Sequence, residues 1–211
     1  METRTNRLTD EALRILPAVA LTVAAGIAFL DETISLAVET FVRSNPLVGG
    51  YTNDIPDLLL PAVLVLSAGM WTAWYLRTRK GLRDVRRDFY RLGGTALPAA
   101  FIAKTAFKLL FGRIETRAWL KNPAPPGLQW FHSGEHHNGF PSGHMTVFAA
   151  LAAACWVFYP RLKGACLFLL LLLGASMLAT NYHFLSDVVA GGYLGLAVAA
   201  AAFEYLERHA S

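Results

Sequence analysis

Apolar residues gather in six runs along the chain, separated by segments that are polar, charged or rich in glycine and proline. The runs cover residues 15–30, 58–76, 95–111, 145–159, 165–180 and 188–205. Most fall slightly short of the roughly 20 residues that cross a bilayer, so we expect the helices to extend into their flanks. The pattern predicts an all-α membrane protein, in which six transmembrane helices pack as a bundle and form one domain over residues 1–211.

Three segments between the runs predict further elements. Residues 31–43 alternate polar and apolar positions at roughly helical spacing, which indicates an amphipathic helix along the membrane surface. Residues 44–57 contain Asn, Pro and Gly residues and predict a loop. Residues 112–140 form the longest loop, before the fourth run, and loops of this length are usually functional or disordered.

The composition agrees with a membrane protein, because 55% of the 211 residues are hydrophobic and the mean hydropathy is +0.39. Cys155 and Cys166 both lie inside apolar runs and are expected to be small buried hydrophobes, not a disulfide or a metal pair. Basic residues before the first run also suit a signal peptide. However, Asp31 and Glu32 follow that run where small residues would mark a cleavage site, which favours a retained span.

The 19 Lys and Arg residues predict a topology. The N-terminal segment, the segments after the second and fourth runs and the C-terminal segment hold 3, 7, 2 and 1 of them, 13 in all. The positive-inside rule makes these four segments, including both termini, cytoplasmic. A net charge of +4 is also found in nucleic-acid-binding proteins, but clustering by loop favours a membrane and no nucleic-acid partner. We expect a multi-pass protein of a bacterial inner membrane.

The opposite, periplasmic face then collects the long loop, two histidines and most of the remaining cations. Five of the six remaining cations lie in a single stretch before His144: Lys104, Lys108, Arg113, Arg117 and Lys121. Cations beside histidines at the start of a helix have the composition of a phosphate site.

The sequence Pro141-Ser142-Gly143-His144 predicts a turn that opens directly into the fourth helix. Ser142 suits the helix cap, and Gly143 lets the backbone approach a ligand closely. The free amide groups of the first turn and the helix dipole favour an anion there, beside an imidazole that exchanges protons near neutral pH. The alternative is an ordinary capped helix start with an incidental histidine.

A second constellation lies before the last run, where His183 and Asp187 are four residues apart. On a helix they share a face, and a carboxylate beside an imidazole fixes its tautomer and stabilises its charged form. The alternative is a capping aspartate near a surface histidine.

These residues resemble the type-2 phosphatidic acid phosphatase superfamily, whose pattern has three parts. The second part, Pro-Ser-Gly-His, is present unaltered. The third part, Ser-Arg, five residues, His, three residues, Asp, ends correctly but has Met177 in place of its arginine. The first part, Lys, six residues, Arg-Pro, begins with Lys108 and reaches Glu115 and Thr116 where Arg-Pro is expected.

The resemblance implies hydrolysis of a lipid phosphate or diphosphate without a metal or other cofactor. His183 would attack phosphorus and form a phosphohistidine, and Asp187 would orient it. His144 would protonate the leaving oxygen and then activate water. The groups that would hold the phosphate oxygens are Ser142, the Gly143 amide and Lys108.

The two missing arginines call for substitutes, and Arg113 and Arg117 stand two positions on either side of Glu115. We expect both to bind the phosphate, with Lys104 a further candidate one turn before Lys108. The alternative is that the two arginines are interface charges or pair with Glu115.

Several functions share this pattern of residues. A phosphotransferase would use the same intermediate with another acceptor, and a non-catalytic lipid-binding relative would keep the fold alone. A soluble haloperoxidase-like relative agrees poorly with six apolar runs. Polyprenyl diphosphate, phosphatidic acid, phosphatidylglycerol phosphate and a lipid A phosphate all remain open as substrates, because pocket shape decides among them.

Overall fold

The computed structural model describes residues 2–45, 58–123, 127–132, 134 and 136–209, with side chains from residue 8 onward. Within these residues every regular element is a helix, which confirms the all-α prediction. The elements are α1 (Glu2–Ala25), the π-helical turn η1 (Gly26–Leu30), α2 (Asp31–Ser44), α4 (Leu59–Arg79), α5 (Val85–Phe111), α6 (Thr116–Lys121), α7 (Gly143–Phe158), the short 3-10 helix η2 (Pro160–Leu162), α8 (Lys163–Ala179) and α9 (Leu185–Arg208). Most of the predicted loop 44–57 lies outside the described residues.

All six apolar runs fall in helices, but within the described residues only five helical stretches are long and apolar enough to cross a membrane. They are Leu8–Ser44, Leu59–Arg79, Val85–Lys121, Pro160–Ala179 and Leu185–Arg208. The fourth run forms α7, which has 16 residues and begins only at Gly143. At 1.5 Å per residue, α7 is about 24 Å long, less than the roughly 30 Å of a hydrocarbon core. The count of five candidate spans therefore differs from the predicted six.

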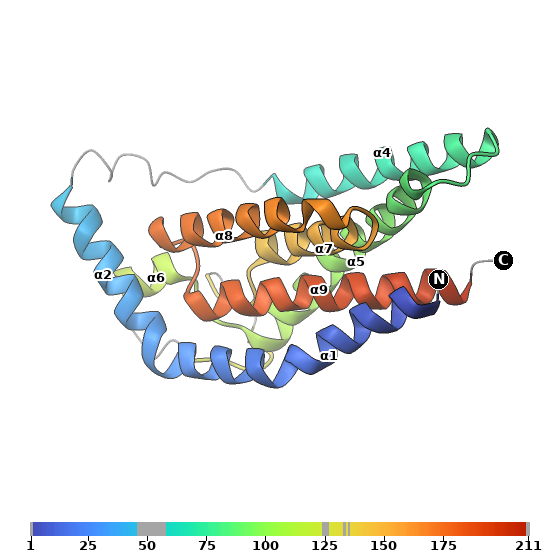
Figure 1. The fold of residues 1–211 in the computed structure, drawn as a ribbon. Coiled ribbons are helices and arrows are strands. Elements are labelled where there is room, and N and C mark those ends of the chain that lie inside the picture. The colour runs from blue at the N-terminus through green and yellow to red at the C-terminus, as the bar shows by residue number, and fades with distance from the viewer. Residues whose placement is uncertain (1, 46–57, 124–126, 133, 135, 210–211) are drawn as a thin grey trace.

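The helices run between two distinct ends of the bundle (Figure 1). The start of α1, the end of α9, the α4–α5 turn and the α7–α8 turn lie at one end. The starts of α7 and α9 lie at the other end, together with α2 and α6. The four segments that hold most of the basic residues thus share one end, as their charge indicated, and both motif histidines lie at the opposite end.

The predicted surface helix 31–43 corresponds to α2, which continues from α1 through the π-helical turn η1. Its inward face buries Asp31 and Ser35, and the helix contacts α6, α8 and α9. The predicted long loop 112–140 contains the short helix α6. Both elements lie at the end of the bundle where the histidines lie (Figure 1).

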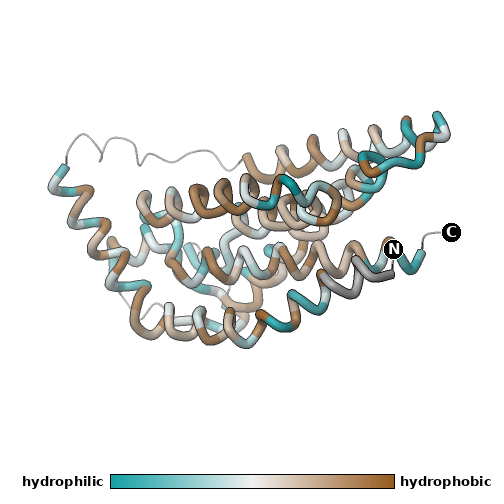
Figure 2. The backbone as a smooth tube through the Cα atoms, in the orientation of Figure 1, coloured by the Kyte–Doolittle hydropathy of each residue, from teal (hydrophilic) through white to brown (hydrophobic). Residues whose placement is uncertain are grey.

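The core joins α4, α5, α7 and α9 through small and branched side chains such as Ala96, Leu97, Ala150 and Ala199. The outer surface is also apolar: on α8, Phe168 and Leu171 are each 64% exposed. Figure 2 shows this apolar character along α8, whereas hydrophilic residues gather at the α4–α5 turn. Apolar side chains directed outward as well as inward are typical of helices surrounded by lipid.

Glycines bring α7 and α9 into close contact. A Cβ atom on Gly191 would lie 2.6 Å from the Ser142 carbonyl oxygen, and one on Gly195 would lie 2.2 Å from that of Thr146. Small residues four apart let helix backbones approach closely in this way. The Ser142 amide also donates to the Asp187 carbonyl oxygen at 3.0 Å, so the second and third motifs lie side by side.

Candidate active site

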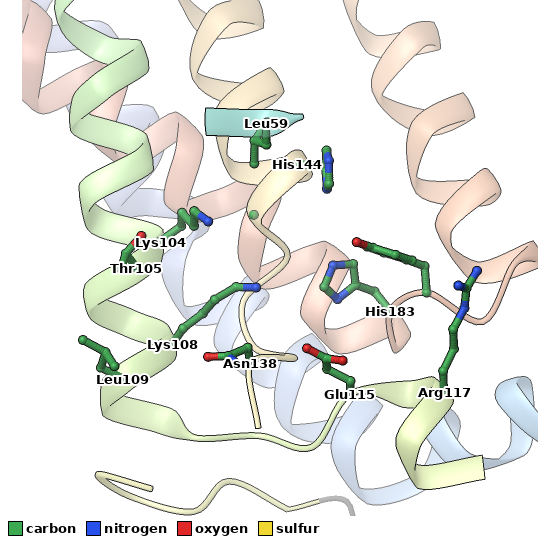
Figure 3. Close-up of a pocket in the computed structure, with 12 residues that line it drawn as sticks. Leu59, Lys104, Thr105, Lys108, Leu109, Glu115, Arg117, Asn138, His144 and His183 are labelled. Carbon is green, nitrogen blue, oxygen red and sulfur yellow. The ribbon is translucent and has the colours of Figure 1, made fainter. Parts of the chain in front are cut away.

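A cavity of about 430 Å³ opens at the end of the bundle that holds the histidines (Figure 3). Its walls come from the start of α4, the last turns of α5, α6, the start of α7 and the turn before α9. The lining residues are Leu59, Lys104, Thr105, Lys108, Leu109, Glu115, Arg117, Asn138, Gly143, His144, Tyr182 and His183. The structure therefore brings the two motif histidines and three cations to one space.

Tyr182 contacts both motif histidines. Its ring centroid lies 6.0 Å from that of His144 and 5.1 Å from that of His183. His144 belongs to the first turn of α7, whose cap is Ser142: the Ser142 hydroxyl oxygen accepts from the Met145 amide at 3.4 Å. The imidazole of His144 thus lies at a helix N-terminus, where amide groups and the dipole favour an anion.

The turn that carries His183 is held from two sides. Asn181, which adopts a positive φ of 49°, donates from Nδ2 to the Ser35 carbonyl oxygen of α2 at 3.3 Å. On the other side, Arg117 of α6 donates from Nη2 to the Thr180 carbonyl oxygen at 3.2 Å. These contacts fix a short segment between α8 and α9 that has no regular structure of its own.

His183 is only 5% exposed, and its Nδ1 atom lies 3.6 Å from Asp187 Oδ2. This Nδ1 atom is buried and has no hydrogen-bond partner at normal distance. Asp187 Oδ2 accepts from the Phe184 amide at 3.1 Å, which fixes the carboxylate at the start of α9. Since Nδ1 faces the carboxylate, Nε2 is the ring nitrogen left for a ligand.

Three cations line the cavity. The Nζ atom of Lys104 lies 4.1 Å above the Phe101 ring, and the guanidinium of Arg117 lies 5.2 Å from the Tyr182 ring centroid. In Figure 3 the Lys108 side chain extends from α5 toward the region of His183. A Cβ atom on Gly143 would lie 3.2 Å from Lys104 Cδ, so the missing side chain lets Lys104 pass over the helix start.

Arg113 does not line the cavity, in contrast to the expectation from sequence. Its guanidinium is fully buried and donates to Asp187 Oδ1 at 2.6 Å, to Ser186 Oγ at 2.6 Å and to Asp31 Oδ2 at 2.7 Å. We call Asp31, Arg113, Ser186 and Asp187 the buried network. The reason is local: Gly112 has a φ of 45° and ends α5, so Arg113 leaves the helix that carries Lys108.

Ser142 likewise is not among the residues that line the cavity, and it is 0% exposed. Its hydroxyl donates to the sulfur of Met177 at 3.4 Å. Met177 stands where the family pattern has arginine, and it packs against Met145 and Val188. At this position an apolar contact has replaced a cation, whereas Gly143 remains at the cavity wall.

Asp31, Ser186 and Tyr182 were not among the candidates from sequence. In the sequence, Asp31 only follows the first apolar run. The structure extends that run into the helical stretch Leu8–Ser44, where a carboxylate is an ionisable group of the kind that marks functional sites in membranes. Ser186 and Tyr182 carry no distinguishing pattern, and only the fold shows their contacts.

The fold and the cavity together define an all-helical protein of the multi-pass membrane type with a basic, histidine-containing site. A family model described as PAP2 superfamily matches residues 89–210, more than half of the chain, and the chain belongs to this superfamily, that of the type-2 phosphatidic acid phosphatases. Its members are generally phosphatases of phosphate esters. Comparisons with curated proteins and with solved structures gave no match.

Proposed function

We propose that the protein is an integral-membrane phosphatase that hydrolyses a lipid-linked phosphate or diphosphate through a phosphohistidine. The observation that carries this proposal is the shared cavity, in which His144 and His183 lie with Lys104, Lys108 and Arg117. Positive charge around an open space at a helix N-terminus favours a phosphate, whose negative charge grows in the transition state.

The first half of the reaction transfers the phosphoryl group to His183. The Nε2 lone pair attacks phosphorus, and the bond from phosphorus to the lipid oxygen breaks. His144 gives its proton to that leaving oxygen. Asp187, beside Nδ1, holds the ring and stabilises the positive charge that the imidazole gains.

In the second half, water attacks phosphorus and the phosphorus–nitrogen bond breaks. His144, now neutral, takes a proton from the attacking water, and inorganic phosphate leaves. The Gly143 amide and the cavity cations hold the phosphate oxygens through both halves, which is where preorganised donors lower the barrier most.

The cavity end of the bundle is the one away from the basic turns (Figure 1). With those turns in the cytoplasm, the cavity faces the periplasmic side of a bacterial inner membrane, where a lipid headgroup reaches it from the bilayer. One domain, residues 1–211, carries the whole activity.

The experiment is a phosphate-release assay on the purified full chain with four lipids: a polyprenyl diphosphate, phosphatidic acid, phosphatidylglycerol phosphate and a lipid A phosphate. The wild type is expected to release inorganic phosphate from at least one of them, and His183→Ala to lower that rate by about 10⁴-fold or more. The matched control is His137→Ala, since His137 does not line the cavity.

Two results would contradict the proposal: no phosphate released from any of the lipids, or an undiminished rate in His183→Ala. Phosphate passed to a second lipid instead of water would identify a phosphotransferase with the same intermediate. Acid-labile label trapped on the wild type and missing from His183→Ala would support the phosphohistidine.

A further inference from the structure

Asp31 lies outside the cavity and outside the family match, yet its carboxylate is completely buried. It begins α2, directly after the π-helical turn η1. Oδ1 accepts from the Ser186 amide at 3.0 Å, and Oδ2 accepts from the Ser186 hydroxyl at 2.5 Å and from Arg113 Nη2 at 2.7 Å. A buried carboxylate needs such partners, because removing it from water is costly.

Contacts lead from Asp31 to the proposed nucleophile in a few steps. Arg113 donates from Nη2 to Asp31 and from Nη1 to Asp187 Oδ1. Ser186 also joins the two sides, since its hydroxyl accepts from Arg113 and donates to Asp31. Asp187 then presents its other oxygen, Oδ2, to His183 Nδ1. Asp31 is therefore hydrogen-bonded to both Arg113 and Ser186, and Arg113 in turn is hydrogen-bonded to Asp187.

The charges of the buried network do not balance among themselves. Two carboxylates, those of Asp31 and Asp187, face the single guanidinium of Arg113, and all three side chains are 0% exposed. An uncompensated buried charge is costly. A positive charge on the His183 ring, as in a phosphohistidine, offsets the excess, because its buried Nδ1 faces Asp187.

We propose that Asp31 is a positioning residue for His183. It fixes Arg113 and Ser186, and through them the orientation of Asp187. Its charge also favours the positively charged phosphohistidine over the free enzyme. This inference rests on the proposed function, in which His183 is the nucleophile. Asp31 lies before residue 89, where the family match begins, whereas all the motifs of the site lie after it. The inference therefore gives α2 a part in the site.

The test compares Asp31→Asn with Glu32→Gln, its exposed neighbour on the same helix, in the full chain and on the lipid phosphate that the wild type hydrolyses. Asparagine keeps the shape of the side chain and removes the charge. We expect kcat to fall about 10- to 100-fold, by analogy with the loss caused by removing a group that orients a metal-ligating histidine. KM should change less than about twofold, because Asp31 does not line the cavity.

The level of trapped phosphoenzyme supplies a readout that a purely structural role does not change. It should fall in Asp31→Asn and stay at the wild-type level in Glu32→Gln. Ser186→Ala keeps every charge and removes the hydroxyl that joins Arg113 to Asp31, so a smaller loss in kcat, about 3- to 10-fold, is expected. This second variant carries the test if Asp31→Asn does not fold.

Wild-type kcat and phosphoenzyme level in folded Asp31→Asn would overturn the inference, and so would an activity loss that only follows the loss of folded protein. If Asp31→Asn does not fold, wild-type kcat in Ser186→Ala overturns it. The proposed function fails separately, and the inference with it, if the wild type is inactive or if His183→Ala retains wild-type activity.

Discussion

Two clusters of charge meet at His183, and they differ in how their charges are compensated. In the cavity, three cations border an open space and hold positions in which a ligand can reach them. In the buried network, the side chains of Asp31, Arg113 and Asp187 are closed off from solvent and pair with one another at 2.6 to 2.7 Å. The cavity charges thus border the space that a substrate would occupy, whereas the network charges hold segments of the protein together.

Arg113 and Arg117 show the difference most directly, since they are four residues apart and looked equivalent in the sequence. Arg117 lies at the cavity wall, and Arg113 lies in the buried network. The comparison teaches that charge and spacing alone do not identify a phosphate ligand. Burial separates the two: Arg113 is fully buried among carboxylates, whereas Arg117 is only partly buried and borders the cavity.

The largest effect is expected from removing the network cation. Arg113→Met leaves two buried carboxylates without their common partner, so the free energy of unfolding should fall by about 3 to 5 kcal/mol. Arg117→Met removes a partly exposed cation at the cavity and should cost about 1 kcal/mol or less, while raising KM. Denaturation of both variants in detergent measures the contrast, and equal losses of stability would refute the distinction between the two clusters.

A cavity cation should show the opposite behaviour, with activity lost and stability kept. Lys108→Met keeps the apolar stem and removes the charge. We expect kcat/KM to fall about 100-fold, the scale of a lost oxyanion donor, with an unchanged melting temperature. Lys121→Met is the matched control, because Lys121 is exposed at the end of α6 and does not line the cavity. Equal kinetics in the two variants would show that Lys108 does not face the substrate.

The packing of η1 against the network allows a smaller perturbation. A Cβ atom on Gly26 would lie 3.0 Å from Ser186 Cβ, so Gly26→Ala should push the two segments apart and cost about 1 to 3 kcal/mol in unfolding free energy, together with some kcat. Gly69 in α4 has nothing within 4 Å of such an atom, and Gly69→Ala should be neutral or stabilising. Wild-type stability and kcat in Gly26→Ala would contradict this prediction, because the buried network would then tolerate a displacement of η1.

Much of this molecule could be predicted because long apolar runs and short motifs are local signals. The apolar runs indicated the helices, and the basic segments indicated which helix ends lie on the same side of the bundle. His144 and His183 could be placed at the same end because each adjoins a predicted helix terminus. The family resemblance, read from three motifs, is confirmed by the match to residues 89–210.

The rest depended on contacts between distant parts of the chain. Asp31 and Ser186 are 155 positions apart, and no local pattern relates them. Gly112, in the left-handed conformation, ends α5 between Lys108 and Arg113. The position of Arg113 relative to Lys108 therefore could not be predicted from helical spacing. The predicted count of six spans is not confirmed, because α7 is apolar but shorter than a full crossing.

The smallest effect is expected at the partly exposed pair of Arg77 and Asp84, at the opposite end of the bundle. This pair is the reference for the buried network. Arg77 donates to the Asp84 carboxylate, which also accepts from the Arg87 amide at 3.0 Å and so caps α5. The hydrogen bond from Arg77, and then that amide, hold the pKa of Asp84 below its ordinary value of 3.8.

A lowered pKa means that the ionised carboxylate stabilises the folded state. This contribution is complete well above pH 3.8 and is lost as the pH falls through the lowered value. Asp84→Asn keeps a capping side chain and removes the charge, so its melting temperature should lie slightly below that of the wild type at neutral pH. The difference should shrink as the pH falls below 3.8. A constant difference across that range would show that the charge of Asp84 contributes nothing, and a difference as large as that of Arg113→Met would remove the contrast between exposed and buried pairs.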